Sequence, residues 1–221
     1  MVAQAAARIR EVTSGSQQLR VLVNNAGVYE EIDMISCSDD EWGAVAERSH
    51  RVNFQAPLEL TRSFAKHVAS LRAPPSPSTT EGQGTLDSGA LSPLLAGRAP
   101  PPPIEGAIVN VSSRGAYRGE PMAPTYGAYK AALCSLTQSM AQLLGKYGIV
   151  VAAVAPGFVD TPMAAGVLAD PVRARAVAGQ SSWERVATAG EVAAAVAFLA
   201  SGSTPFATGT VIDVNGASHL R

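Results

Sequence analysis

The sequence predicts an α/β protein built on a parallel β-sheet. Four mainly apolar segments have the length and composition of buried strands, and helical patterns separate them; the segments are residues 20–27, 106–113, 149–157 and 210–214. Strands that alternate with helices pair in parallel, and we expect right-handed crossovers between them. With 221 residues and 47% apolar residues, the chain can form one domain with its own core.

The first strand is predicted from Arg20 to Gly27. Its centre, Val21 to Val23, is apolar on both faces, which is typical of a strand inside a parallel sheet. It ends in the small and polar run Asn24-Asn25-Ala26-Gly27. Before it, Met1 to Val12 has the apolar spacing of an amphipathic helix.

A long helix follows the first strand. Ser38 and Glu41 form a capping-box pattern that starts it, and apolar residues continue the helical spacing from Trp42 to Val68. Asn53 lies within it as an isolated polar residue. Mid-helix asparagine is unfavourable by propensity and often simply faces solvent.

Residues 73–103 interrupt this pattern. The segment is rich in proline and serine, with few large apolar residues, so burial cannot offset the entropy of ordering it. We expect a disordered insertion within a single domain of residues 1–221. A polyproline ligand for an aromatic groove is the functional alternative, and a faulty gene model would leave the same pattern.

The second strand ends in Ser112 and Ser113, where ligands bind in open α/β sheets. A helix is predicted from Tyr126 to Tyr147, which places Tyr126 and Lys130 on one face. A phenol with a pKa near about 10 is a poor acid-base group at neutral pH, but a neighbouring ammonium lowers that pKa. The pair therefore suits proton transfer, although such spacing is also common on solvated helix faces.

The remaining elements complete the sheet. The third strand is closed by the turn Pro156-Gly157, and residues 158–187 lack clear periodicity. Within them, we expect the segment from Phe158 to Trp183 to form a lid and part of a pocket. Thr188 and Glu191 form a second capping box before an alanine-rich helix that reaches Leu199. Residues 210–214 form the last strand.

Five motifs in this order resemble the short-chain dehydrogenase/reductase family. They are NNAG at Asn24 to Gly27, the helix asparagine Asn53, Ser113, YxxxK at Tyr126 and Lys130, and PGxxxT at Pro156 to Thr161. The resemblance implies a Rossmann-like, doubly wound sheet and an NAD- or NADP-dependent oxidoreductase that interconverts an alcohol and a ketone or aldehyde. It implies the catalytic residues Asn53, Ser113, Tyr126 and Lys130, and the cofactor-binding residues Asn24, Ala26, Gly27, Tyr126, Lys130, Pro156, Gly157, Val159 and Thr161.

One family feature has no counterpart in this sequence. The turn TGxxxGxG, which places the cofactor pyrophosphate at a helix N-terminus, is absent, as are the strands around it. We therefore expect an N-terminally truncated sheet of about four strands, with NAD and NADP left undistinguished. A catalytically inactive fragment or interaction module is the main alternative, and a nicotinamide-dependent epimerase is a weaker one.

The composition of the chain limits which kinds of binding partner we expect. A net charge of −1 and a pI near 6.3 argue against nucleic acid, and no run reaches the length of a membrane span. Cys37 and Cys134 are expected to be reduced, and no metal-ligand spacing occurs. We expect a cytoplasmic enzyme for a small carbonyl or alcohol substrate, homo-oligomeric at full length. Arg114 and Arg118 lie near the expected site and could meet an anionic substrate, but we expect both to face solvent.

Overall fold

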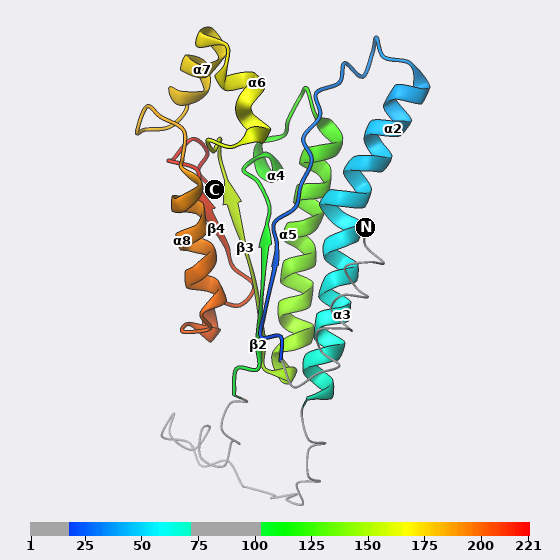
Figure 1. The fold of residues 1–221 in the computed structure, drawn as a ribbon, viewed down its shortest axis with the longest axis vertical. Coiled ribbons are helices and arrows are strands. Elements are labelled where there is room, and N and C mark those ends of the chain that lie inside the picture. Colours follow the sequence, from blue (N-terminus) through cyan, green and yellow to red (C-terminus); the bar gives the residue numbers. More distant parts are fainter. Residues whose placement is uncertain (1–17, 72–102) are drawn as a thin grey trace, which may run out of the picture.

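The computed structural model describes residues 18–71 and 103–221, and within them four strands form one parallel sheet (Figure 1). The strands are β1 (Val21–Asn24), β2 (Gly106–Val111), β3 (Ile149–Pro156) and β4 (Val211–Val214). They lie side by side in chain order, with Val23 beside Val109 and Val109 beside Ala152. The predicted α/β fold with a parallel sheet is confirmed.

One face of the sheet is covered by two long helical segments. The first consists of α2 (Asp39–His50), the π-helical turn η1 (Arg51–Gln55) and α3 (Ala56–Ser70), and the second is α5 (Pro124–Leu144). Phe64 of α3 and Leu144 of α5 pack with Ile108 and Val151 of the sheet into one buried cluster. Because α2, η1 and α3 follow each other without a break, the predicted long helix is present, with a π turn at Asn53.

The opposite face is covered, within the described residues, by α8 (Ala189–Ala200), which stands alone on that side of the sheet (Figure 1). Leu199 packs there with Val109, Ala152 and Val154. The helices between β1 and β2 and between β2 and β3 lie on the other face, although all three crossovers step in the same direction. The crossover through α8 therefore has the opposite hand, and our expectation of uniform handedness is wrong for it.

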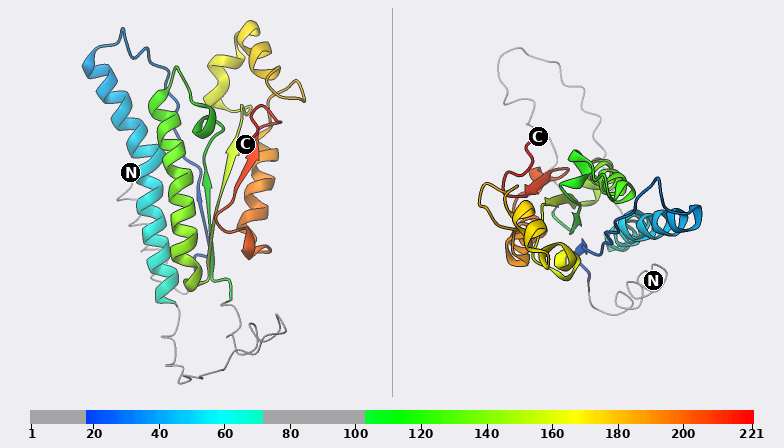
Figure 2. Two further views of the ribbon diagram at one scale, coloured as in Figure 1. Left: turned by 180° about the vertical axis from the view of Figure 1, so that it is seen from behind. Right: turned by 90° about the horizontal axis from the view of Figure 1, so that it is seen from above.

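Short helices lie beyond the carboxyl ends of the strands, as the left view in Figure 2 shows. Residues 158–187, for which no periodicity was found, contain η3 (Pro162–Ala164), α6 (Ala165–Leu168) and α7 (Pro171–Ala178). The other short elements are α4 (Gly115–Arg118), which follows β2, and η2 (Gly145–Tyr147) and η4 (Pro205–Ala207), which precede β3 and β4.

Both predicted capping boxes are present. The Ser38 hydroxyl accepts from the Glu41 backbone N–H at the start of α2, and Thr188 does the same for Glu191 at the start of α8. β1 forms one edge of the described sheet, and Val21 and Val23 are 44% and 40% exposed, which agrees with the expected sheet of about four strands, in which this strand lies at the edge. The expected helix at Met1 to Val12 and nearly all of the expected insertion lie outside the described residues.

None of the described helices is both long and apolar enough to cross a bilayer. In the same part of the chain, no group of three or more histidine, cysteine or acidic side chains is arranged to hold a metal ion.

Candidate active site

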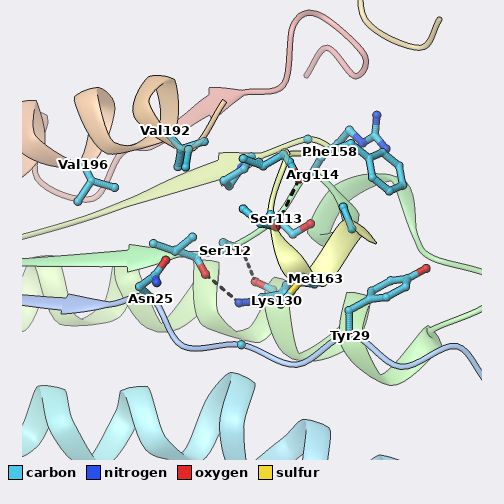
Figure 3. Close-up of a pocket in the computed structure, with 18 of the residues that line it drawn as sticks. Asn25, Tyr29, Ser112, Ser113, Arg114, Lys130, Phe158, Met163, Val192 and Val196 are labelled. Carbon is cyan, nitrogen blue, oxygen red and sulfur yellow. Dashed lines mark hydrogen bonds between the residues drawn. The ribbon is translucent and has the colours of Figure 1, made fainter. Parts of the chain in front are cut away.

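A cavity of about 920 Å³ opens at the carboxyl ends of β1, β2 and β3. Figure 3 shows that its walls come from the loops after these strands, from α5 and from α8. These are loops that a parallel sheet brings together at one edge, where open α/β sheets bind ligands. Of the predicted site residues, Ala26, Gly27, Ser113, Tyr126, Lys130, Pro156, Gly157, Val159 and Thr161 line it.

Ser113 and Tyr126 are brought together from two different elements. Ser113 follows β2, Tyr126 lies in the first turn of α5, and a hydrogen bond from the Ser113 side chain lowers the pKa of the Tyr126 phenol. The Ser113 hydroxyl also accepts from the Gly115 backbone N–H at 3.0 Å, which leaves its own proton free to donate. The two hydroxyls thus form a pair that can bind one oxygen atom.

The net pKa shift of Tyr126 differs from our expectation. Burial is the largest cause and raises the pKa of Tyr126, and the Glu120 carboxylate adds to the rise. Lys130 is not among the groups that shift the Tyr126 pKa, although its ammonium lies 5.6 Å from the Tyr126 ring centroid. In this state the phenol therefore keeps its proton, as a general acid must.

Lys130 is itself desolvated. The Lys130 residue is 3% exposed, its ammonium donates to the Val111 carbonyl at 2.8 Å, and burial lowers its pKa from 10.5 to about 8. The backbone carbonyl fixes the ammonium beside the cavity, one helical turn after Tyr126. A buried ammonium with one backbone acceptor has further N–H groups to donate to a ligand.

Asn53 does not line the cavity but fixes the loop that does. Its side-chain oxygen accepts from the Val28 N–H at 3.0 Å, and its amide donates to the Val28 carbonyl at 2.9 Å. A Cβ at Gly27 would lie 3.3 Å from both the Asn53 Oδ1 and the Lys130 Nζ. The π turn thus places Asn53 directly behind Gly27, where it positions the loop beside Lys130.

Asn24 requires a correction. Its side chain points away from the cavity and donates to Asn110 at 2.8 Å, and Asn110 donates to Thr137 on α5 at 2.9 Å. These buried amides tie β1, β2 and α5 together, so the Asn24 side chain has a structural role in place of the expected cofactor contact. Its neighbour Asn25 lines the cavity instead, because successive side chains of a strand point to opposite faces.

Several cavity residues were missed by sequence reasoning. Tyr29 meets Tyr126 edge-on at 5.1 Å between ring centroids, and burial raises the pKa of Tyr29 to about 12. Glu120 also faces the cavity, and burial raises the pKa of its carboxyl. Arg114, which was expected to face solvent, is 3% exposed and lines the cavity. Apolar side chains of α8, among them Val192 and Val196, form the far wall.

Fold and site together define a Rossmann-like α/β protein with a serine-tyrosine-lysine cluster at the ligand-binding edge of its sheet. A family profile described as Enoyl-(Acyl carrier protein) reductase matches residues 90–219, more than half of the chain. The chain belongs to the short-chain dehydrogenase/reductase family.

Individual relatives agree with this membership. The cis-4-hydroxycyclohexanecarboxylate dehydrogenase of Sinomonas cyclohexanicum is 47% identical over 111 residues, which are 50% of this chain and 44% of that protein. The 3-oxoacyl-(acyl-carrier-protein) reductase FabG of Chlamydia muridarum is 28% identical over 95% of this chain and 69% of its own length. A proposed NAD(P)-dependent gluconate 5-dehydrogenase from Beutenbergia cavernae, solved with NADP at low occupancy, is 26% identical with a TM-score of 0.75, over 97% of this chain and 71% of that one.

Proposed function

We propose that this protein is an NAD- or NADP-dependent oxidoreductase that interconverts an alcohol and a ketone or aldehyde, with Tyr126 as general acid and base. The observation that carries the proposal is that Ser113, Tyr126 and Lys130, which come from two different elements, line one cavity. Membership of a dehydrogenase/reductase family supports it.

In the reducing direction, the substrate oxygen lies between the Ser113 hydroxyl and the Tyr126 phenol. Ser113 donates a hydrogen bond that stabilises the developing oxyanion, and Tyr126 transfers its proton to the same oxygen. The raised pKa of Tyr126 suits this step because the phenol stays protonated at neutral pH. In the oxidising direction Tyr126 accepts the proton, and Ser113, which lowers the Tyr126 pKa, favours the phenolate that this requires.

The residues at the cavity fit the nicotinamide end of the cofactor. Ala26, Gly27, Pro156 and Gly157 offer small surfaces, and a Cβ at Gly157 would come within 3.2 Å of Asn215. We propose that these residues, with Val159 and Thr161, hold the nicotinamide, and that the Lys130 ammonium binds the adjoining ribose hydroxyls. When bound, the nicotinamide supplies or removes the hydride.

The substrate of this protein does not follow from the names of its relatives. Their names describe a cyclohexane ring acid, an acyl-carrier-bound 3-oxoacyl group and a sugar acid, and a shared fold does not dictate one of these. A cytoplasmic location and a homo-oligomeric state also stay predictions.

The test is a titration of the 221-residue chain with NAD, NADH, NADP and NADPH, followed by turnover with a panel of cyclic and linear ketones. We expect the 221-residue chain to bind dinucleotides weakly or not at all, because the pyrophosphate-binding turn TGxxxGxG has no counterpart in this sequence. The same chain joined to a matching N-terminal segment that carries this turn should bind at least one dinucleotide and oxidise its reduced form when a ketone is present. Failure of the joined protein to bind would favour the inactive interaction module, and tight binding by the 221-residue chain alone would overturn the expected role of that turn.

A further inference from the structure

Two cationic side chains are buried among the described residues, Lys130 and Arg114, each 3% exposed. Lys130 belongs to the proposed chemistry, whereas Arg114 has no role in it. We propose that Arg114 binds a carboxylate of the substrate, so that the enzyme acts on a hydroxy or oxo acid. This inference rests on the proposed function and names the substrate class of the same site.

Arg114 is held in place by two segments, residues 156–158 and the C-terminal loop that contains Ser218. Its backbone N–H donates to the Pro156 carbonyl at 2.8 Å, and its guanidinium lies over the Phe158 ring at 5.4 Å from the centroid. One guanidinium N–H donates to the Ser218 hydroxyl at 2.7 Å. A guanidinium fixed in this way loses little side-chain entropy when it binds a ligand.

No carboxylate in the described part of the chain forms an ion pair with Arg114. A second cavity of about 280 Å³ adjoins the first at Arg114, and both acidic residues that line it are paired elsewhere. Asp213 binds Arg221 at 2.9 Å, and Glu191 binds Arg185 at 2.6 Å. A buried cation without an anionic partner is costly, and a ligand anion would offset that cost.

Glu120 is the acidic residue that remains near Arg114, and it limits the ligand's charge. Arg114 and Arg118 both lower the pKa of Glu120, although burial raises it more. Two arginines and one glutamate leave an excess of about one positive charge when Glu120 is ionised. A monoanionic, planar carboxylate matches that excess and the fork of one guanidinium, whereas a phosphate dianion would need a further cation.

The position of Arg114 is suited to a substrate that also reaches the chemistry. Arg114 directly follows Ser113, and both face the cavity that Tyr126 lines (Figure 3). Phe158 and Met163 supply apolar wall near it. A substrate with its carbonyl at Ser113 and Tyr126 can therefore reach Arg114 with a carboxylate while its apolar body contacts these side chains.

The test measures binding without hydride transfer, on the full 221-residue chain. The probe is cyclohexanecarboxylate, which has no oxidisable hydroxyl, and its neutral match is cyclohexanecarboxamide; both are titrated by calorimetry or ligand-observed NMR. We expect the acid to bind about tenfold to a hundredfold more tightly than the amide. Arg114→Gln should remove this preference and leave amide binding unchanged, and Arg114→Lys should retain part of it.

Arg118→Gln is the matched control. Arg118 lies one helical turn later, is exposed and donates to Gln180 at 3.2 Å, so its loss should change the acid-to-amide ratio by less than about threefold. Inorganic phosphate should compete weakly, and tight phosphate binding would point to a phosphorylated substrate and overturn the carboxylate assignment. Equal binding of acid and amide by the wild-type chain, or no binding of either, would also overturn it.

This design separates the two proposals. Tyr126→Phe should leave cyclohexanecarboxylate binding intact, because the probe undergoes no proton transfer. A chain that prefers the acid through Arg114 but oxidises no hydroxy acid would keep the carboxylate site and contradict the oxidoreductase. If Arg114→Gln does not fold, the acid-to-amide ratio of the wild-type chain and of Arg114→Lys still decides the outcome.

Discussion

The two faces of the sheet differ in how completely they are covered. On the face under α3 and α5, Phe64, Val68 and Val151 are at most 1% exposed, and the amides of Asn24 and Asn110 add buried hydrogen bonds. On the α8 face, Val154 is fully buried while Val23, on the edge strand, is 40% exposed. The tightly packed face carries Tyr126 and Lys130, and the more open face leaves room for ligand.

This difference has a physical reason. Groups that move protons must be held in one geometry, and close-packed surroundings restrict their motion. A ligand needs space and apolar surface, which the small side chains of α8 supply between Val192 and Ala200. One face of the sheet thus holds the groups that move protons in place, and the other face leaves space for the ligand.

Replacing Tyr126 by Phe should have the largest effect. The change keeps the ring and deletes the proton donor, so turnover should fall by about 10²–10⁴-fold while the urea midpoint changes little. The measurement is the initial rate with the best ketone of the panel and its dinucleotide. Tyr129→Phe is the control, because Tyr129 lies three residues later on α5 and packs against His50 and Phe54 outside the cavity. Similar losses in both variants would remove Tyr126 from catalysis.

The sequence predicted the packed face better than the open one. Apolar runs located all four strands, and the spacing of Tyr126 and Lys130 placed both on the wall of one cavity. Local sequence patterns are enough to predict these features, because both the burial of a strand and the spacing along a helix depend on residues that are close together in the sequence. The face on which α8 packs depends on a crossover whose hand no local pattern specifies.

Side-chain environments were harder to predict than elements. Arg114 was expected at the surface because arginine usually lies there, but Phe158 and Ser218, 44 and 104 residues away, close over it. The Tyr126 pKa was expected to fall because Lys130 is near in sequence, whereas burial by distant segments dominates. Such contacts exist only after the chain has folded.

Lys130 provides the second test of the packed face. The pKa of Lys130 is about 8 in the folded protein, whereas an unburied lysine has a pKa of 10.5. Between these two pH values the unfolded chain therefore binds more protons than the folded one. The free energy of unfolding should therefore rise as pH increases from about 8 to 10.5, by up to about 3 kcal/mol from this group. Lys130→Met should lack this contribution. The measurement is urea unfolding of both proteins across that range, and a wild-type-minus-variant difference that does not depend on pH would contradict the buried ammonium.

The smallest effects are expected for valine-to-alanine changes at three positions, which differ in the face of the sheet and in their distance from its edge. Val151→Ala and Val154→Ala remove two methyl groups from fully buried sites on opposite faces of β3, and each should lower the free energy of unfolding by about 2–3 kcal/mol. Val23→Ala should cost less than about 1 kcal/mol, since water already reaches that side chain.

All three valines lie in strands, so the loss of β propensity is similar and the contrast reports packing. If the predictions hold, the α8 face is open only towards β1, because the Val154 site on the same face is as well packed as the Val151 site. A loss for Val154→Ala as small as that for Val23→Ala would mean that the whole α8 face is loosely packed. A loss for Val23→Ala as large as that for Val151→Ala would mean that the β1 edge is covered in solution, and the ligand space would then be smaller than the cavity indicates.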